Sequence, residues 1–218
     1  MVTAAAPQPS TSTVDPGSPL RSDPGYTFDF CGGHLAIDFT NTVGDRGAET
    51  VDHFRSFGDV VAWAEARGVV ARATAATLRQ RAATDPEGAA RAFRSALALR
   101  EALYGVLAAA ASGRRVRPAD LNVVNQHVAD TFKGVALAPS GEHFALETRA
   151  EAWLDPVIRP VVRAAVDLLT SDALKQVGRC ADHECGWLFL DTTRSRTRRW
   201  CDMRVCGNRN KVRRFRQT

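Results

Sequence analysis

The sequence contains no long apolar run and no apolar segment at its N-terminus. The longest stretch without a polar break, about Tyr104–Ala111, is far shorter than the ~20 apolar residues that a helix needs to span a bilayer. The first ten residues, MVTAAAPQPS, have neither the positive charge nor the apolar core of a secretory signal. We therefore expect a cytoplasmic protein with no membrane partner. Thiols stay reduced in the cytoplasm, where cysteines favour metal ions over disulfides.

Signatures of catalysis and internal repeats are also missing. His34, His53, His127 and His143 are scattered and never have the H-x-x-x-H spacing of a zinc enzyme. No nucleophile elbow and no phosphate-binding loop is present. His34 and Asp38 could form an acid–base pair on one face of a strand, but two polar residues on an exposed strand face are the commoner explanation. We therefore expect no enzyme.

The remaining composition is that of a soluble globular protein, with 44% hydrophobic and 24% charged residues in a chain of 218. Residues 1–27 contain five of the ten prolines together with many Ser and Thr, and such a segment buries too little apolar surface to fold. We divide the chain into a disordered leader (1–27), a helical body (28–177) and a C-terminal metal module (178–218).

The body has the pattern of an α+β domain that is mostly helical and contains a small antiparallel sheet. Leu35, Ile37 and Phe39 alternate with polar or small residues, which predicts a strand over about 34–39. Five helices follow: one capped by Ser56 and ended by Gly68, one over about 71–83, one from Asp85-Pro86 to Ser112-Gly113, one after Pro118, and one opened by Asp155-Pro156.

Two segments between the last two helices predict a hairpin. Val135–Ala138 and His143–Glu147 flank Pro139-Ser140-Gly141, which is a turn sequence. The helix before this hairpin has an apolar face formed by Leu121, Val124, Val128 and Phe132.

Four of the five cysteines lie in the last forty residues, in the pattern C-x4-C-x15-C-x4-C. Cys180, Cys185, Cys201 and Cys206 thus form two close pairs, separated by a stretch that is long enough to fold back. Tetrahedral Zn²⁺ accepts four such thiolates, and four cysteines leave no coordination position for water. We therefore predict one structural zinc ion, with an Fe–S cluster or redox-active thiols as alternatives.

The surroundings of these cysteines fit a small module that depends on its metal. Trp187 and Phe189 alternate with two leucines, which predicts a short strand whose aromatic face covers the metal. His183 lies between two of the cysteines and could replace one as a ligand, although an exposed position is commoner. Cys31 is distant in sequence, and we interpret it as a small apolar residue. About forty residues bury too little core to fold alone, so zinc is expected to supply most of the module's folding free energy.

Positive charge is concentrated in the same segment. Residues 179–218 contain 11 Lys and Arg against 4 Asp and Glu, a net charge of +7, whereas residues 1–178 contain 18 against 20, a net charge of −2. Guanidinium groups suit bidentate contacts with phosphate, which predicts a nucleic-acid-binding surface; a solvated, solubilising tail is the alternative. The candidate contacts are Arg194, Arg196, Arg198, Arg199, Arg209, Lys211, Arg213, Arg214 and Arg216.

A short terminal helix is predicted to arrange the last five of these residues on two faces. Asn208 or Asn210 could cap this helix. One face would consist of Arg209, Arg213 and Arg216, and another of Lys211 and Arg214.

These segments resemble a known family. Residues 185–193 read CGWLFLDTT, residues 198–201 read RRWC, and residues 206–209 read CGNR; together they resemble the CGNR zinc finger family. Members of that family usually carry an N-terminal helical ABATE domain, and residues 34–42, HLAIDFTNT, look like its LxLDFxNT opening motif. The resemblance covers about residues 30–218, and Asp202 departs from it where relatives often have Ser. It implies zinc binding and a DNA-binding role in transcription, and it alone favours DNA over RNA.

One residue of the body suggests a ligand. Arg100 lies on the apolar stripe of the longest predicted helix, where a charge needs a carboxylate or an anionic ligand. Asp38, Glu101 and Asp167 are candidate partners, and internal pairing is the commoner outcome. The alternative is a small anionic effector that contacts Asp38, Asn41 and Arg100.

Together these observations predict a zinc-dependent DNA-binding transcription regulator. Its body would sense a ligand or mediate assembly, with homo-oligomers as one form of assembly. The alternative is an adaptor whose zinc module docks on an acidic surface of a partner protein.

Overall fold

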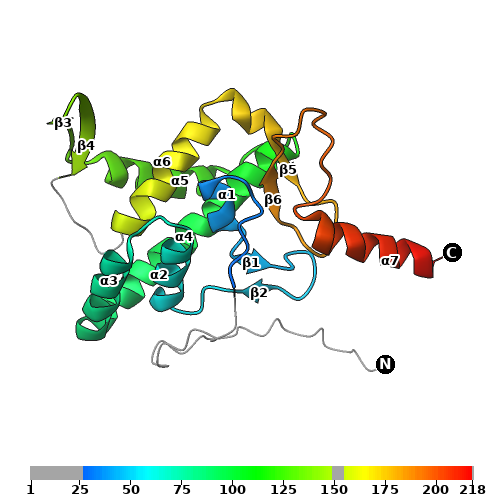
Figure 1. The fold of residues 1–218 in the computed structure, drawn as a ribbon, viewed down its shortest axis with the longest axis horizontal. Helices are drawn as coiled ribbons and strands as arrows, with labels where there is room; N and C mark the ends of the chain where they lie inside the picture. The colour runs from blue at the N-terminus through cyan, green and yellow to red at the C-terminus, as the bar shows by residue number, and fades with distance from the viewer. Residues whose placement is uncertain (1–26, 149–154, 218) are drawn as a thin grey trace, which may run out of the picture.

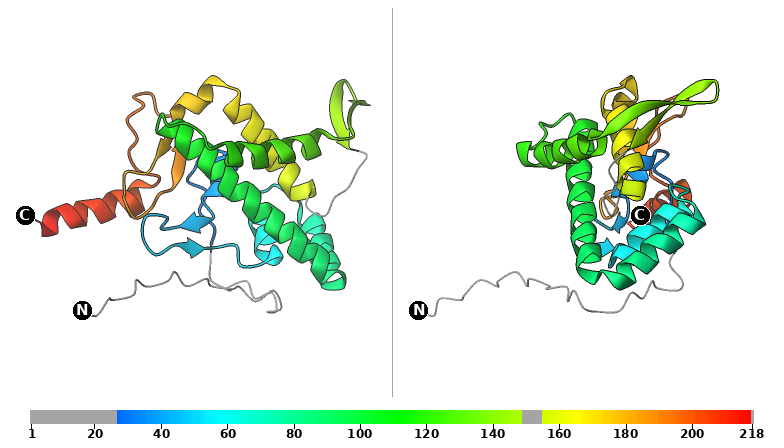
Figure 2. Two further views of the ribbon diagram at one scale, coloured as in Figure 1. Left: turned by 180° about the vertical axis from the view of Figure 1, so that it is seen from behind. Right: turned by 90° about the vertical axis from the view of Figure 1, so that its left-hand side faces the viewer.

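The computed structural model describes residues 27–148 and 155–217, so the predicted leader lies outside this part except for its last residue. Within it, helices dominate and the strands form three two-stranded antiparallel sheets. This arrangement confirms the predicted α+β class with a mostly helical body. The C-terminal segment lies at one end of the long helix α4 (Pro86–Ala111), and the β3–β4 hairpin lies at the opposite side of the molecule (Figures 1 and 2).

The segment expected to be a strand over 34–39 is instead helix α1 (Leu35–Thr40), so that prediction is wrong. His34 caps the helix, with its Nδ1 accepting a hydrogen bond from the backbone N–H of Ala36 at 3.3 Å. The helix packs against α4, α6 and β6, and residues 36–40 are all buried. Asp38 is therefore as buried as its apolar neighbours. The alternation in the sequence does not mark one buried face, because α1 is covered on several sides.

The predicted helices of the body are confirmed to within a few residues. The Oγ of Ser56 accepts a hydrogen bond from the N–H of Asp59 at 3.3 Å, and the Oδ1 of Asp85 accepts one from Gly88 at 2.8 Å. These bonds satisfy N–H groups that a helix leaves unpaired in its first turn. Ser56 and Asp85 precede α2 and α4. The five helices predicted for the body are α2 (Phe57–Ala66), α3 (Arg72–Thr84), α4, α5 (Pro118–Phe132) and α6 (Asp155–Leu169).

Helix α5 presents a different face to the core from the predicted one. Val124 is buried and Val128 packs against the core, but Leu121 and Phe132 are 44% and 43% exposed. The buried face instead includes Asp120, whose carboxylate occupies the space beside Gly105 of α4 that a Cβ would fill. Asp120 thus belongs to the buried face of α5 although it is polar. A search for apolar periodicity cannot identify such a residue.

Strands β3 (Val135–Ser140) and β4 (His143–Thr148) form the predicted hairpin, with Leu137 paired with Leu146. Phe144 lies two residues before Leu146 and therefore on the same face of the hairpin. Leu137, Phe144 and Leu146 are 69%, 73% and 47% exposed. The hairpin thus presents an apolar face to solvent.

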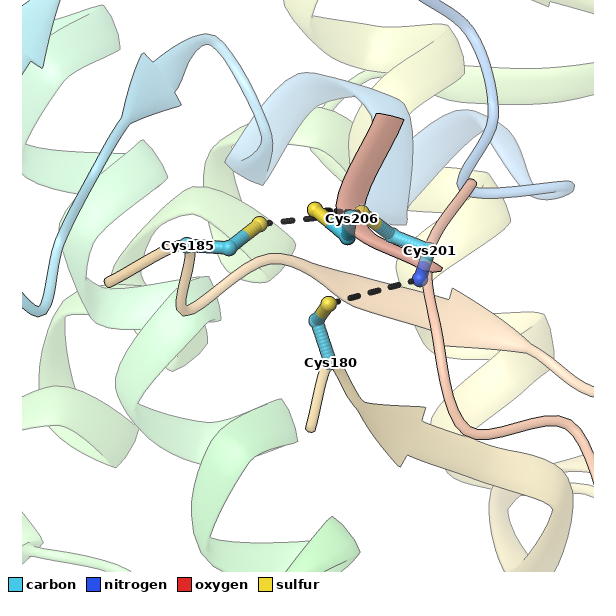
Figure 3. Close-up of side chains that lie close together, drawn as sticks. All are labelled: Cys180, Cys185, Cys201 and Cys206. Atoms are coloured by element: carbon cyan, nitrogen blue, oxygen red, sulfur yellow. Dashed lines mark hydrogen bonds between the residues drawn. The ribbon is translucent and has the colours of Figure 1, made fainter. Parts of the chain in front are cut away.

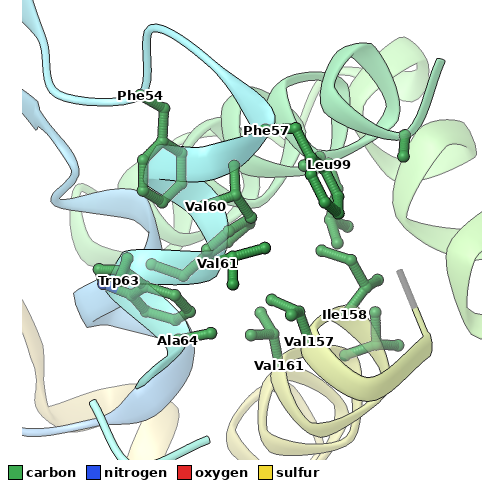
Figure 4. Packing of buried hydrophobic residues seen from close by; sticks show 14 of the residues in the cluster. Phe54, Phe57, Val60, Val61, Trp63, Ala64, Leu99, Val157, Ile158 and Val161 are labelled. Carbon is green, nitrogen blue, oxygen red and sulfur yellow. The ribbon is translucent and has the colours of Figure 1, made fainter. Parts of the chain in front are cut away.

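The core joins the helices of the body to one another. Val61 and Ala64 of α2 lie opposite Val157 and Val161 of α6 (Figure 4). The ring centroid of Trp63 is 5.2 Å from that of Phe39 in α1. This packing holds α1 in place, and α1 in turn packs against β6 of the C-terminal segment.

The remaining elements are short. Among the described residues, no helix combines the length and the apolar character that a membrane crossing requires. The short elements are β1 (Val43–Gly44), β2 (Val51–Asp52), the 3₁₀ helix η1 (Asp172–Gln176), β5 (Val177–Arg179), β6 (Leu188–Leu190), the π-helical turn η2 (Met203–Gly207) and α7 (Asn208–Arg216).

Arg100 is a buried charge that joins β2 to α4. Its side chain is 3% exposed, and its two amino groups donate to the carboxylate of Asp52 at 2.7 and 2.6 Å. Its Nε donates to Glu101 at 2.9 Å. Asp52 is 40% exposed and Glu101 48% exposed, so the two carboxylates can be hydrated while the guanidinium cannot.

This asymmetry predicts unequal costs for removing the two partners. Asp52→Asn leaves the buried Arg100 charge with Glu101 as the remaining one of its two carboxylate partners and is expected to lower the free energy of unfolding by about 2 kcal/mol, whereas Arg100→Met leaves carboxylates that water can reach and is expected to cost less than about 1 kcal/mol. Urea unfolding of both variants with zinc in excess checks this. A larger cost for Arg100→Met would contradict it.

Candidate metal centre

The four C-terminal cysteines converge from separate short segments. Cys180 follows β5, Cys185 lies in the turn before β6, Cys201 follows the arginine loop (residues 191–200), and Cys206 lies in η2. Pairing of β5 with β6 brings the first two together, and the N–H of Cys180 donates to the carbonyl of Trp187 at 2.8 Å. All four side chains are buried, and their sulfur atoms lie within 4.8 Å of one another (Figure 3).

The distances between the sulfur atoms fit a tetrahedral metal ion. The Sγ of Cys201 is 3.6 Å from the Sγ of Cys185 and 3.6 Å from that of Cys206. Four thiolates bound about 2.3 Å from Zn²⁺ would lie about 3.8 Å apart. Four sulfur ligands complete the coordination of zinc and leave no position for a reactive water, so the donor set fits a structural ion.

The four thiols cannot all ionise without a cation. Hydrogen bonds from Cys185 and Cys201 hold the pKa of Cys180 at about 2, whereas burial and the nearby Cys180 thiolate raise the pKa of Cys206 to about 11. The pKa values of Cys185 and Cys201 are also raised, chiefly by their hydrogen bonds to Cys180. A bound dication would stabilise the thiolate form of all four.

Aromatic side chains cover the cysteines as predicted. Phe189 is buried against the sulfur cluster, and Trp187 and Trp200 pack against it while partly buried. Cys31 also packs there, although it is distant in sequence. His183 has a side chain that is 73% exposed and lies beside Glu184, so it is not part of the four-residue cluster.

The side chain of Arg198 makes hydrogen bonds within the protein. Its guanidinium donates to the backbone carbonyls of Trp200 at 3.0 Å and Cys31 at 2.9 Å, and also to that of Cys201. Its centre lies 4.6 Å from the ring centroid of Phe189. The sequence placed Arg198 among the nucleic-acid contacts, but these bonds direct it inward.

Arg209 and Arg213 on one face of α7 are held by an acidic clamp, which consists of Asp45, Asp182 and Glu184. Asp182 has no exposed side-chain surface, and it lies 3.1 Å from Nε of Arg209 and 2.9 Å from an amino group of Arg213. Glu184 contacts both arginines, and Asp45 lies 3.6 Å from Arg209. These two arginines therefore attach α7 to the turn between the first two cysteines.

The sequence analysis missed the clamp, although the sequence contains a signal for it. Asp182 and Glu184 lie between the first two cysteines, so the convergence of the four cysteines also places these acids beside the basic helix that follows Cys206. Six of the nine predicted contacts are left exposed: Arg194, Arg196, Arg199, Lys211, Arg214 and Arg216.

The module is joined to the body by hydrogen bonds to its backbone. The side chain of Asn41, at the end of α1, accepts from the N–H of Leu188 at 3.0 Å and donates to its carbonyl at 2.9 Å. In addition, the N–H of Arg46 donates to the carbonyl of Cys185 at 3.1 Å, and the N–H of Gly47 donates to that of Glu184 at 2.9 Å. The metal-binding turn is thus bonded directly to the β1–β2 loop.

Each residue of the predicted effector pocket forms hydrogen bonds or ion pairs with other residues of the protein. Asp38 accepts from the N–H of Gly32 at 2.9 Å and from Nε of Arg67 at 2.8 Å, and burial raises its pKa to about 6. Asn41 binds β6, and Arg100 binds Asp52 and Glu101 instead of Asp38. Each of the three side chains thus completes a different internal polar contact.

The comparisons with known families agree with this geometry. Residues 33–172 match the ABATE family, which is described as "Putative stress-induced transcription regulator". The chain belongs to the ABATE family. Residues 176–218 match the CGNR zinc finger, as the motifs predicted, and the four adjacent thiols of this finger form its site for one structural zinc ion. Both are regulatory or zinc-finger families rather than enzyme families. No curated protein matches the chain.

The ligand assignment predicts how zinc content responds to single Cys→Ser changes. Cys201 makes both of the short sulfur contacts, so Cys201→Ser is expected to reduce bound zinc to well below one ion per chain. Cys31→Ser is the matched control and should retain a full ion. Metal analysis of purified protein gives the content, and circular dichroism reports the fold. A Cys201→Ser variant that keeps both its zinc and its fold would show that the assignment is wrong.

The junction between body and zinc finger predicts a second effect. Asn41→Ala leaves both backbone groups of the buried Leu188 without a partner, and is expected to lower the free energy of unfolding by about 2–4 kcal/mol. Asn125→Ala, on the exposed side of α5, should change it by less than about 0.5 kcal/mol. Urea unfolding at saturating zinc measures both, and equal costs would contradict the role of Asn41.

Proposed function

We propose that this protein is a zinc-dependent transcription regulator that binds DNA through its zinc finger. The main support is the position of the six exposed cationic residues. They lie on two segments that are each adjacent to a zinc ligand. The arginine loop is followed by Cys201, and α7 begins two residues after Cys206. The metal site therefore fixes both groups of cations relative to each other.

Such an arrangement suits the phosphate backbone of a nucleic acid. Arginine binds phosphate through two parallel N–H donors, and each contact neutralises a phosphate and releases a bound counterion. The family description, a transcription regulator, favours DNA over RNA. The cytoplasm is the compartment in which reduced thiols would keep the zinc bound.

Of the two roles expected for the body, assembly has the stronger support. Leu137, Phe144 and Leu146 form an exposed apolar face on the hairpin, and an isolated two-stranded hairpin is marginally stable in water. Sensing of a small anion has less support, since Asp38, Asn41 and Arg100 have separate internal partners.

An adaptor function is the second candidate. Met203, Val205, Val212 and Phe215 are at least half exposed near the basic residues. Apolar side chains among cations also suit an acidic protein surface. DNA retention distinguishes the two candidates.

The proposal predicts a strong salt dependence of DNA affinity. Neutralisation of five or six phosphates gives a slope of about −5 for log affinity against log salt concentration. Replacement of two loop residues, Arg194→Gln with Arg199→Gln, is expected to reduce the slope by about 2 and leave zinc content unchanged. Fluorescence anisotropy with a random-sequence duplex at several salt concentrations measures both slopes.

The control changes net charge equally at a distant site. Arg91→Gln with Arg94→Gln alters two exposed arginines in the half of α4 next to α3, and it should leave the slope as it is. A slope near zero for the zinc-loaded wild type would reject DNA binding and favour the adaptor.

A further inference from the structure

Helix α7 projects from the rest of the molecule. It follows η2 and extends outward to the C-terminus in Figure 1 and in the left-hand view of Figure 2. Its contacts with the acidic clamp come from Arg209 and Arg213. These contacts hold one side of the helix against the metal-binding turn.

The opposite side of α7 combines positive charge with an exposed aromatic ring. At 100° per residue, Lys211, Arg214 and Phe215 lie across the helix from Arg209 and Arg213. Phe215 is 85% exposed, and Val212 beside it is 50% exposed. We call Lys211, Arg214 and Phe215 the outer face. It combines donors for anions and base edges with an apolar group.

The charge of the helix points to a polyanion as the occupant of this face. The sequence of α7, NRNKVRRFR, contains five cationic residues and no acidic one, and the clamp engages two of the five. Its apolar residues are Val212 and Phe215, which are neighbours on the helix surface but form an apolar patch of only two side chains. A continuous stripe would be expected of a helix that lies in a membrane surface.

Size and chemistry match the major groove of DNA. An α-helix with its side chains is about 10–12 Å across, and the groove is about 12 Å wide and admits a helix. Base edges in this groove offer acceptors to Lys and Arg, and the thymine methyl group offers an apolar contact. The arginine loop, attached to the same zinc site, would remain beside the duplex at its phosphates.

We propose that α7 inserts its outer face into the major groove, with Lys211 and Arg214 toward base edges and Phe215 against thymine methyl groups. This inference rests on the proposed DNA-binding function and assigns the contacts within it. The arginine loop binds phosphate in this arrangement, and α7 supplies the sequence-dependent part.

The test compares two random-sequence duplexes of equal length, using the full-length zinc-loaded protein. In one duplex each cytosine carries a glucosylated hydroxymethyl group at C5, which fills the major groove and leaves the phosphates unchanged. We expect the unmodified duplex to bind roughly tenfold more tightly, because the glucosyl groups block contacts with base edges.

A pair of Phe→Ala variants provides the second arm. Phe215→Ala is expected to weaken binding to the unmodified duplex by about fivefold and to leave binding to the glucosylated duplex unchanged. Phe132→Ala removes a ring that is 43% exposed at the end of α5, outside the hairpin face and the zinc finger, and it should change neither affinity. Zinc content and circular dichroism check that both variants are folded.

The outcomes separate this inference from the function on which it rests. Equal affinity for the two duplexes, with a steep salt slope, would overturn insertion into the major groove and leave DNA binding intact. Failure to bind either duplex would reject the proposed function as well. If Phe215→Ala instead abolishes binding to vesicles of anionic lipid, or self-association without DNA, while DNA affinity is unchanged, then the outer face serves a membrane or a second copy and the inference is wrong.

Discussion

The bonds between one zinc ion and four thiolates constrain the C-terminal segment more than any other interaction does. Few apolar side chains surround the cysteines: Phe189 is buried there, and Trp187 and Trp200 are only partly buried. Burial of one such side chain contributes about 1.5–3 kcal/mol, whereas ordering the backbone costs about 1–2 kcal/mol for every residue. Hydrophobic burial near the metal therefore cannot order the segment from Cys180 to Cys206, and metal binding has to supply the difference.

The same constraint extends into the body through backbone hydrogen bonds. The carbonyl of Cys185 accepts from Arg46, and both backbone groups of Leu188 bind the side chain of Asn41. A metal ligand and the strand that follows it are thus bonded to residues more than a hundred positions earlier. The ABATE domain and its zinc finger share a buried polar junction, so the orientation of the finger on the body is defined in the folded chain.

Part of this arrangement was predictable from local patterns. Capping residues and helical periodicity gave the helices of the body, because both depend on neighbouring residues. The C-x4-C-x15-C-x4-C spacing identified the zinc site for the same reason. The strand predicted over 34–39 failed because α1 is covered on several sides, and alternation is informative only where one side faces water. For Arg100 the adjacent partner, Glu101, was among the predicted candidates, but Asp52 was missed, since it comes from a separate strand and no local rule pairs it with Arg100.

The predicted DNA surface shows why a count of charges does not locate a binding face. The nine basic residues contribute equally to the net charge of the segment, yet Arg198 donates to backbone carbonyls and Arg209 and Arg213 bind the acidic clamp. Asp182 and Glu184 lower the net charge of the zinc finger, but they determine which side of α7 faces outward. A finger with the same arginines and without these acids would be more basic, and its terminal helix would lack a fixed orientation. The acidic residues between the first two cysteines therefore define the direction of the basic surface.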